Sequence, residues 1–195
     1  MSQRDEGGNR MRYISWMTLL LSMLLLVSCG SSDSVDDVEL ANYEVNQTIA
    51  ETVKNDFIFR LASEKEEYEQ GEHVELYGEV IYTGEKEEIT IAHSAVAIQF
   101  NLHEHIRGFE ISSAIPEIGI QTELVANEPY RENYEKQHIF KIEDNPKDYV
   151  EFIDDFQERQ DFPPGYYVVQ GSANFYDGTE NHEMKAKIDF KVRTE

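Results

Sequence analysis

The most regular feature of this chain is an alternation of apolar and polar residues with a period of two, which is typical of β-strands that bury one face. The pattern is clearest over residues 183–193. One face of this run is apolar: Met184, Ala186, Ile188, Phe190 and Val192. The other face is charged: Glu183, Lys185, Lys187, Asp189, Lys191 and Arg193. A shift of one residue would bury the charged set, so we expect one firmly set register with these charges in water.

The same alternation predicts further strands earlier in the chain. They cover residues 57–61, 74–82, 89–91, 96–102, 109–112, 118–125, 137–142 and 167–175. Turn-forming residues separate them at 69–72, at 83–86, where we expect a hairpin, and at Asp177–Gly178. Roughly eight or nine short strands, with turns about every 8–12 residues, predict an all-β sandwich of two antiparallel sheets.

One segment has a helical spacing of apolar residues instead. The spacing i, i+3, i+4, i+7 is occupied by Tyr149, Phe152, Ile153 and Phe156. We expect Asn145 to be the N-cap, Pro146 to take the first helical position and Asp148 to stabilise the first turn. Pro163 and Pro164 prevent the helix from continuing. The pattern therefore predicts one short helix, about 145–160, packed over an open end of the sheets.

Two short motifs resemble those of known domains. Residues 164–169, Pro-Gly-Tyr-Tyr-Val-Val, resemble the entry to the penultimate strand of immunoglobulin-like and fibronectin-like domains, which implies that Tyr167 bonds back to the preceding corner. Residues 68–74, Tyr-Glu-Gln-Gly-Glu-His-Val, resemble the entry to the second strand of bacterial immunoglobulin-like modules. The resemblance implies an all-β, immunoglobulin-like antiparallel β-sandwich with one short inserted helix. It implies no activity, because these signatures mark a fold.

The whole span 56–192 resembles domains of uncharacterised, Bacillus-like lipoproteins of Gram-positive bacteria, and it is more weakly similar to the Bacillus intracellular proteinase-inhibitor domain. The N-terminal stretch agrees with a lipoprotein. Arg10 and Arg12 precede an apolar run that has the length of a signal-peptide core and is too short to span a membrane. Residues 26–30, Leu-Val-Ser-Cys-Gly, resemble the bacterial lipobox. This implies that residues 1–28 are a signal peptide and that Cys29 carries a lipid; both Met1 and Met11 fit as the start.

Composition narrows the class of partner. Removal of three arginines and two acidic residues with the leader leaves 14 basic and 37 acidic residues, a formal charge of −23. Such a chain repels nucleic acid and anionic lipid, so we expect partners that are cations, basic peptides or neutral groups. We expect residues 29–55 to form a flexible acidic linker and residues 56–195 to form the sandwich domain. With Cys29 lipidated, the domain has no disulfide.

Motifs that carry chemistry are missing from the sequence. It has no H-E-x-x-H, no phosphate-binding loop and no G-x-S-x-G, and Ser172 lies within a predicted strand. His103 and His105 share one face of a strand and would bind zinc or copper if His93 supplied a third ligand, but two exposed histidines on a solvent face are the simpler interpretation, which we prefer. Residues 143–145 are an acidic loop that would suit calcium, but helix capping already accounts for it. We expect no catalytic residue, no cofactor and no resident metal.

These observations favour a membrane-anchored, extracytoplasmic lipoprotein that acts as a non-enzymatic binding or accessory module. It would be held in the cell membrane by the lipid on Cys29 and would present loops or an edge strand to a protein partner at the cell surface. One alternative is a protease inhibitor that inserts the loop 114–119 into a protease cleft. Another is an extracytoplasmic metal-binding protein that uses His103 and His105.

Overall fold

A computed structural model describes residue 35 and residues 37–136, 139, 141 and 144–194. The predicted leader, the predicted lipid site Cys29 and the predicted calcium-loop residue Glu143 lie outside the described residues. The chain from Val35 to Glu195 forms one compact unit.

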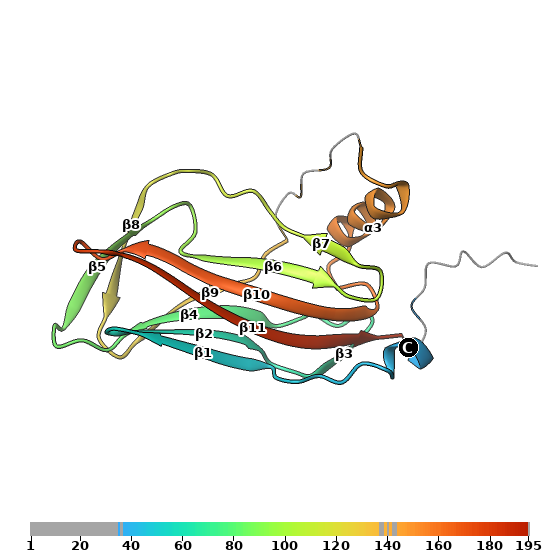
Figure 1. The fold of residues 1–195 in the computed structure, drawn as a ribbon, viewed down its shortest axis with the longest axis horizontal. Coiled ribbons are helices and arrows are strands. Elements are labelled where there is room, and N and C mark those ends of the chain that lie inside the picture. Colours follow the sequence, from blue (N-terminus) through green and yellow to red (C-terminus); the bar gives the residue numbers. More distant parts are fainter. Residues whose placement is uncertain (1–34, 36, 137–138, 140, 142–143, 195) are drawn as a thin grey trace, which may run out of the picture. The chain divides into compact units, whose positions relative to one another are not determined.

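Two sheets make up this unit, stacked as layers in Figure 1. The first has four antiparallel strands in the order β1 (Ile49–Lys54), β2 (Phe57–Ser63), β4 (Leu76–Tyr82) and β9 (Pro129–Asn133). The second has seven strands. Its main path runs β3 (Glu67–Glu69), β11 (Asn181–Arg193), β10 (Gly165–Tyr176), β5 (Glu88–His93) and β8 (Ile120–Val125). Off this path, β6 (Ile98–Glu104) pairs with β10 and with β7 (Phe109–Ile111). The fold is therefore an all-β sandwich, as expected.

All strand pairs are antiparallel except one. β3 runs parallel to the end of β11, with Tyr68 opposite Val192. This short strand follows a connection from the first sheet and lies at the outer edge of β11, where it adds a parallel pair to the predicted antiparallel sandwich.

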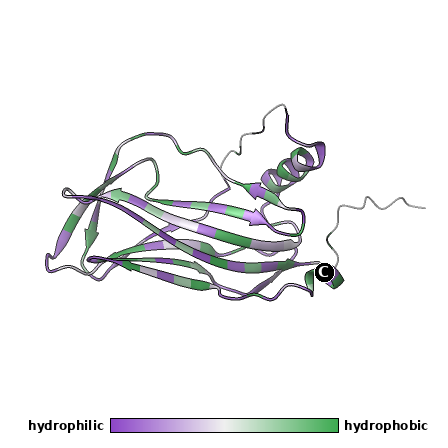
Figure 2. Cartoon of the chain, viewed as in Figure 1, coloured by the Kyte–Doolittle hydropathy of each residue, from purple (hydrophilic) through white to green (hydrophobic). Residues whose placement is uncertain are grey.

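The core lies between the two sheets, where the inward face of each strand is apolar (Figure 2). The alternation is visible as green and purple bands along the strands. Several side chains have an exposed fraction of 0%: Phe59, Leu61, Val80, Tyr167, Val169, Ile188 and Phe190. The predicted inward faces of residues 57–61, 74–82 and 167–175 are confirmed, because these alternating residues are buried. On the outward faces, Glu79 and Ser172 are buried as well.

The hairpin of β10 and β11 is confirmed in detail. Its register runs from Gly165 opposite Val192 to Tyr176 opposite Asn181, and Gly178 at the turn has a φ of +92°. One part of the prediction is wrong. Asp189 and Lys191 were expected in water, but their exposed fractions are only 4% and 9%, because other segments cover the outer face of this end of β11.

The prediction of a flexible linker over residues 29–55 is wrong where the structure describes it. β1 pairs along its whole length with β2. Before it, the one-turn helix α2 (Asp37–Leu40) carries Leu40, which is buried together with Val35 against Tyr166. Residues that read as a polar tether therefore belong to the folded unit, because a few apolar side chains and a paired edge strand attach them.

Three further elements differ from the sequence pattern. Residues 83–86 do not form a hairpin, because β4 lies in the first sheet and β5 in the second. β9 was not predicted, since its alternation is obscured by charged residues on both faces. The strand expected at 137–142 is only partly described; Ile139 is buried and neither it nor Lys141 lies in a strand.

The predicted helix is present as α3 (Lys147–Glu158), with Phe152, Ile153 and Phe156 buried. It begins one residue later than expected: Pro146 occupies the N-cap and no side chain caps the helix. The rings of Tyr149 and Phe152 lie 5.5 and 5.2 Å from that of Phe109, which places α3 beside β7 at one end of the sandwich (Figure 1).

Candidate functional site

The histidines singled out from the sequence do not form a three-ligand site. The His103 and His105 rings do lie side by side, with centroids 5.3 Å apart, and His103 Nδ1 is 2.8 Å from Glu110 Oε1. His93 is far along the second sheet, since its neighbour Ala92 pairs with Tyr176 whereas His103 pairs with Val168. Both His93 ring nitrogens have local partners, the Ser94 carbonyl and the Thr122 hydroxyl. The predicted third ligand is therefore elsewhere.

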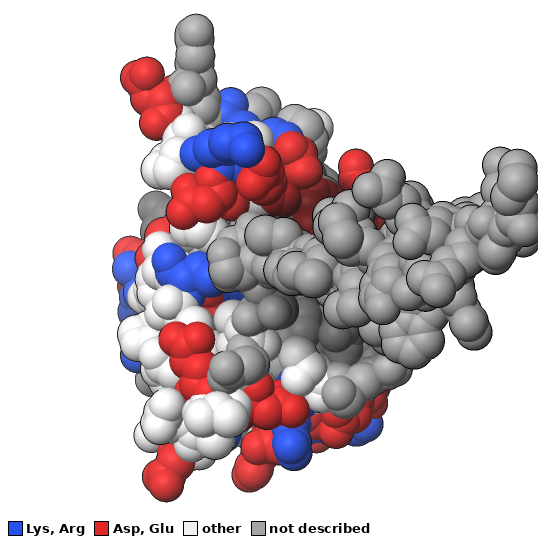
Figure 3. Space-filling model, turned by 90° about the vertical axis from the view of Figure 1, so that its right-hand side faces the viewer, with Lys and Arg blue, Asp and Glu red and all other residues white. Residues whose placement is uncertain are grey.

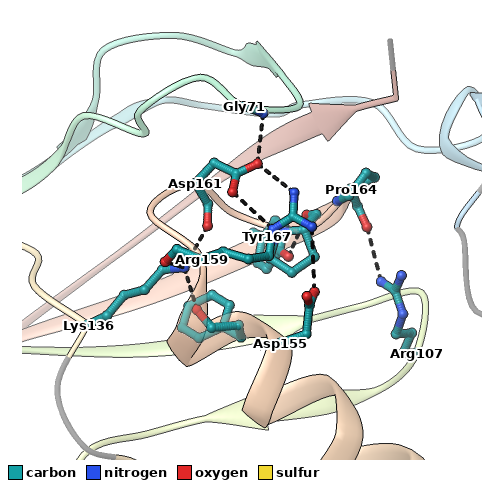
Figure 4. A network of polar contacts seen from close by, with 10 residues as sticks. Gly71, Arg107, Lys136, Asp155, Arg159, Asp161, Pro164 and Tyr167 are labelled. Carbon is teal, nitrogen blue, oxygen red and sulfur yellow. Dashed lines mark hydrogen bonds and ion pairs between the residues drawn. The ribbon is translucent and has the colours of Figure 1, made fainter.

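A network of partly buried charges lies where α3 meets the sandwich (Figure 4). Arg159 donates to both carboxylate oxygens of Asp161, at 2.9 and 2.6 Å, and Asp161 also accepts from the Gly71 backbone N–H at 2.7 Å. Burial raises the pKa of Asp161, but its bonds to Arg159 and Gly71 outweigh burial and hold that pKa below its ordinary value. This carboxylate joins the chain after α3 to the turn after β3.

Lys136 is bound at the same end of the sandwich. Its ammonium donates to the carbonyls of Phe156, Arg159 and Asp161 at 2.6, 3.2 and 2.6 Å, and it lies 3.9 Å from the Phe156 ring centroid. Burial lowers the pKa of Lys136 to about 8. A lysine with a lowered pKa can act as a nucleophile, but here three carbonyls of the chain occupy its donors. The role of Lys136 is therefore structural: it binds the backbone carbonyls at the C-terminal end of α3.

The predicted corner tyrosine is present in the same region. The Tyr167 hydroxyl donates to the Pro163 carbonyl at 2.7 Å, as the resemblance implied. Beside it, Glu104 has an exposed fraction of 0% and accepts from the Arg107 backbone N–H at 2.8 Å. A Cβ on Gly165 would lie 2.7 Å from Glu104 Oε1, so a larger residue at this position would require this buried carboxylate to shift. These polar groups bind loops of the chain itself.

A three-residue cluster of possible metal ligands lies at the tip of the β10–β11 hairpin. Ligand atoms of Asp177, Glu180 and His182 lie within 4.8 Å of one another, the one such group among the described residues. His182 Nε2 is 2.8 Å from Asp177 Oδ2, and Asn55 donates to Glu180 at 2.7 Å. The His182 ring is buried and stacks on Phe175, with centroids 5.0 Å apart.

The ligand atoms of this cluster are nearly, but not fully, at the separations that a divalent metal requires. Zinc held by a histidine nitrogen and a carboxylate oxygen keeps these atoms about 3.3 Å apart, so the Asp177–His182 pair would open by roughly half an ångström. Asp177 Oδ1 accepts from Thr179 and from the Glu180 backbone N–H, which orients the carboxylate. Burial raises the pKa of Asp177, but these bonds and His182 hold it far below its ordinary value. Sequence reasoning identified Asp177 as a turn residue; the spacing Asp-x-x-Glu-x-His was the available signal.

The second candidate is the outer edge of β8. β8 is the last strand of its sheet, and β5 is its one strand partner in the described chain. The Ala126 backbone N–H donates to the Glu87 carbonyl at 2.8 Å, so Ala126 faces its partner strand. Because bonded residues alternate in an antiparallel pair, Gln121 and Glu123 direct their backbone N–H and C=O groups away from the sheet.

Apolar side chains accompany this open edge. Ile118 and Ile120 are 59% and 38% exposed. The preceding segment 112–119 has no regular secondary structure and is largely exposed, and the predicted inhibitor loop 114–119 is part of it. Strand 118–125 was predicted, but a local alternation carries no information on whether a strand lies at an edge of a sheet.

In comparisons with known proteins, no family model and no curated protein matches this sequence. Among the described residues, no helix is both long enough and apolar enough to cross a membrane.

Proposed function

We propose that the protein is a lipid-anchored, extracytoplasmic binding module without enzymatic activity, whose partner adds an extended segment to the edge of β8. The open edge of β8 is the observation that supports this proposal most directly. Its unpaired N–H and C=O groups can bind a strand of another chain, and Ile118 and Ile120 provide apolar contacts beside them.

The charge of the chain indicates which segment would bind. The chain has 39 acidic and 17 basic residues. At the end of the unit opposite β8, seen in Figure 3, acidic side chains lie among basic ones. Glu123 on β8 and Glu117 before it are exposed. A basic or neutral extended segment would therefore approach this edge more readily than an acidic one.

The test removes one outward N–H without disturbing the sheet. Proline is tolerated on an edge strand where its nitrogen faces outward, so Glu123→Pro should fold and should lose the backbone donor that a partner needs. Glu123→Ala retains that N–H and is the matched control. With a photo-crosslinking residue at Gln121 in the full chain on intact cells, we expect a defined protein adduct that disappears in the proline variant and persists in the alanine variant.

Two outcomes would contradict this proposal. One is the absence of any adduct at Gln121. The other is an adduct that survives Glu123→Pro while a thermal melt shows that the variant is folded, since a strand bound to this edge depends on its backbone N–H groups.

The membrane anchor is tested separately. Labelling of cells with a palmitate analogue should modify the full chain, and Cys29→Ser should abolish both the label and sedimentation with membranes. If the serine variant stays labelled, lipid attachment at Cys29 is excluded whatever happens at β8.

The cluster at the hairpin tip favours a second candidate function, the capture of a divalent metal. Calorimetric titration of the full chain with zinc should release heat, and Glu180→Gln should weaken binding because it removes one carboxylate. Glu183→Gln, a neighbouring exposed acid outside the cluster, is the control. No heat with zinc, or equal binding by Glu180→Gln, would remove this candidate.

A further inference from the structure

The outer face of the four-stranded sheet carries a row of alternating charges that crosses all four strands. Glu51 on β1 pairs in register with Arg60 on β2, Arg60 with Glu79 on β4, and Glu79 with Arg131 on β9. Each of these three adjacent pairs forms an ion pair, with nitrogen–oxygen distances of 2.6, 2.7 and 2.6 Å. The row has no net charge, in a chain whose formal net charge is −22.

Two other rows flank the charged one on the same face. One is apolar and consists, in register across the strands, of Val53, Ile58, Ile81 and Pro129. The other is mixed and consists of Ile49, Ala62, Tyr77 and Asn133. We call these twelve residues the sheet face.

Apolar side chains at the margins of the sheet face are exposed to solvent. Ile49 and Val53 are 56% and 67% exposed, and Pro129 is also exposed. The charges in the middle are already neutralised: the Glu79 side chain is only 2% exposed between its two arginines. The ends of the charged row remain accessible, with side-chain exposures of 44% for Glu51 and 45% for Arg131.

We infer that the sheet face binds the sheet face of a second copy of this chain. A twofold axis parallel to the strands, between β2 and β4, reverses the order of every row in the partner. Glu51 then lies opposite the partner copy's Arg131 and Arg60 opposite its Glu79. In the apolar row, Ile58 lies opposite Ile81 and Val53 opposite Pro129. An isologous interface requires this self-complementarity.

The charge row is the feature that selects a second copy over an unrelated partner. Read from β1 to β9, its charges are minus, plus, minus, plus, so the reversed row offers the opposite charge at each position. The rest of the chain is strongly acidic, so two copies that approached through other faces would repel each other.

The size of the sheet face indicates a weak dimer. Four strands about 4.8 Å apart and about 20 Å long provide less than the roughly 800 Å² per partner of a standard interface. Anchoring of both copies in one membrane, which rests on the proposed function, raises their effective concentration. The dimer therefore belongs to the membrane-bound protein.

The experiment uses full chains co-expressed in one membrane with two different tags. One copy carries Val53→Cys and the other Pro129→Cys, which face each other across the dimer at opposite edges of the sheet. We expect oxidation to give a disulfide-linked dimer that contains both tags. Copies that both carry Val53→Cys should not cross-link to each other, because the axis places their β1 strands at opposite sides. Ile49→Cys with Pro129→Cys should fail because these positions lie in different rows.

A charge swap tests the register independently. Arg131→Glu in the copy with Pro129→Cys should reduce cross-linking several-fold, because it faces Glu51 of the other copy. Glu51→Arg in that other copy should restore it. Chains with no introduced cysteine measure the background from Cys29, the one native cysteine.

Failure of the Val53–Pro129 pair to cross-link above this background would overturn the dimer, as would equal cross-linking of the two control pairs. Neither result bears on the edge of β8 or on lipid attachment, which have their own tests.

Discussion

The Tyr166 hydroxyl donates a hydrogen bond to the buried carboxylate of Asp189. The same carboxylate accepts from the Asn46 backbone and side chain, at 2.9 and 2.8 Å, and from the Gln47 backbone at 3.0 Å. One side chain on β11 thus anchors the segment before β1, 143 residues away in the sequence. Tyr43 stacks on Tyr166 at 5.0 Å and extends the attachment.

We predict that Asp189→Ala lowers the free energy of unfolding by about 3 kcal/mol. The change leaves several donors unpaired in a buried position, and bonds to a charged group are among the stronger ones. The measurement is chemical denaturation of the full chain, combined with limited proteolysis of residues 35–48, which should become faster. Glu183→Ala on the same strand is the control, because this exposed residue should change stability by less than about 0.5 kcal/mol. Equal effects would show that Asp189 anchors nothing.

The pH dependence of the free energy of unfolding should reveal the ionisation of Asp189. Burial raises the pKa of Asp189, but hydrogen bonds from Tyr166, Asn46 and Gln47 outweigh it and hold the pKa below its ordinary value. The stabilisation is therefore present above the unfolded pKa of about 4 and is lost as the pH falls through the folded value. Asp189→Asn should flatten the stability curve in this acid window. From pH 6 to 8 the variant should be less stable, with the slope of the curve unchanged. An unchanged slope below pH 4 would contradict this assignment.

Tyr167→Phe should destabilise the domain by about 1–2 kcal/mol. The hydroxyl is buried, and its loss leaves the Pro163 carbonyl without its donor while the packing of the ring on Phe190 is retained. Thermal unfolding of the full chain measures the effect. Tyr176→Phe removes a hydroxyl bond of similar length, 2.8 Å to the Gly178 carbonyl, in an exposed position and should cost much less. If both variants have the same melting temperature, the corner bond contributes no more to stability than the exposed bond does.

Gly171→Ala should cost about 1–3 kcal/mol by overpacking the core. A Cβ at this position would lie 2.7 Å from Leu61 Cδ1, so β10 and β2 approach each other here through the missing side chain. Leu61→Ala alone should also be costly, but the double variant should lose less than the sum, because the new methyl group occupies the vacated space. A double-mutant cycle in urea measures this coupling. Strict additivity would contradict it. Gly119→Ala, in open space, is the neutral control.

Local patterns predicted the hairpin of β10 and β11 well, because its two strands are consecutive and its turn contains Asp177 and Gly178. The corner bond of Tyr167, whose partner is four residues away, was implied by the resemblance of residues 164–169 to immunoglobulin-like and fibronectin-like domains and not by periodicity. Local patterns failed for Asp189, which has the sequence environment of an exposed strand residue. Its partners come from residues 46 and 47, and no local periodicity indicates that a distant segment will cover one position of a strand.

The candidate sites divide in the same way. His103 and His105 do lie side by side, as their spacing in a strand requires, but the position of His93 depended on the order of the strands. The cluster of Asp177, Glu180 and His182 arises within six residues and was accessible to sequence reasoning, although a turn explained Asp177 alone.

The sequence by itself determined which residues face the core, because a strand with one buried face must alternate in hydrophobicity whatever it pairs with. Tertiary structure alone decided which strands pair, that β8 is the last strand of its sheet, and that Glu51, Arg60, Glu79 and Arg131 form one row. These depend on pairings between distant segments. Each pairing is selected by how the whole core closes, which the period of a single strand does not encode.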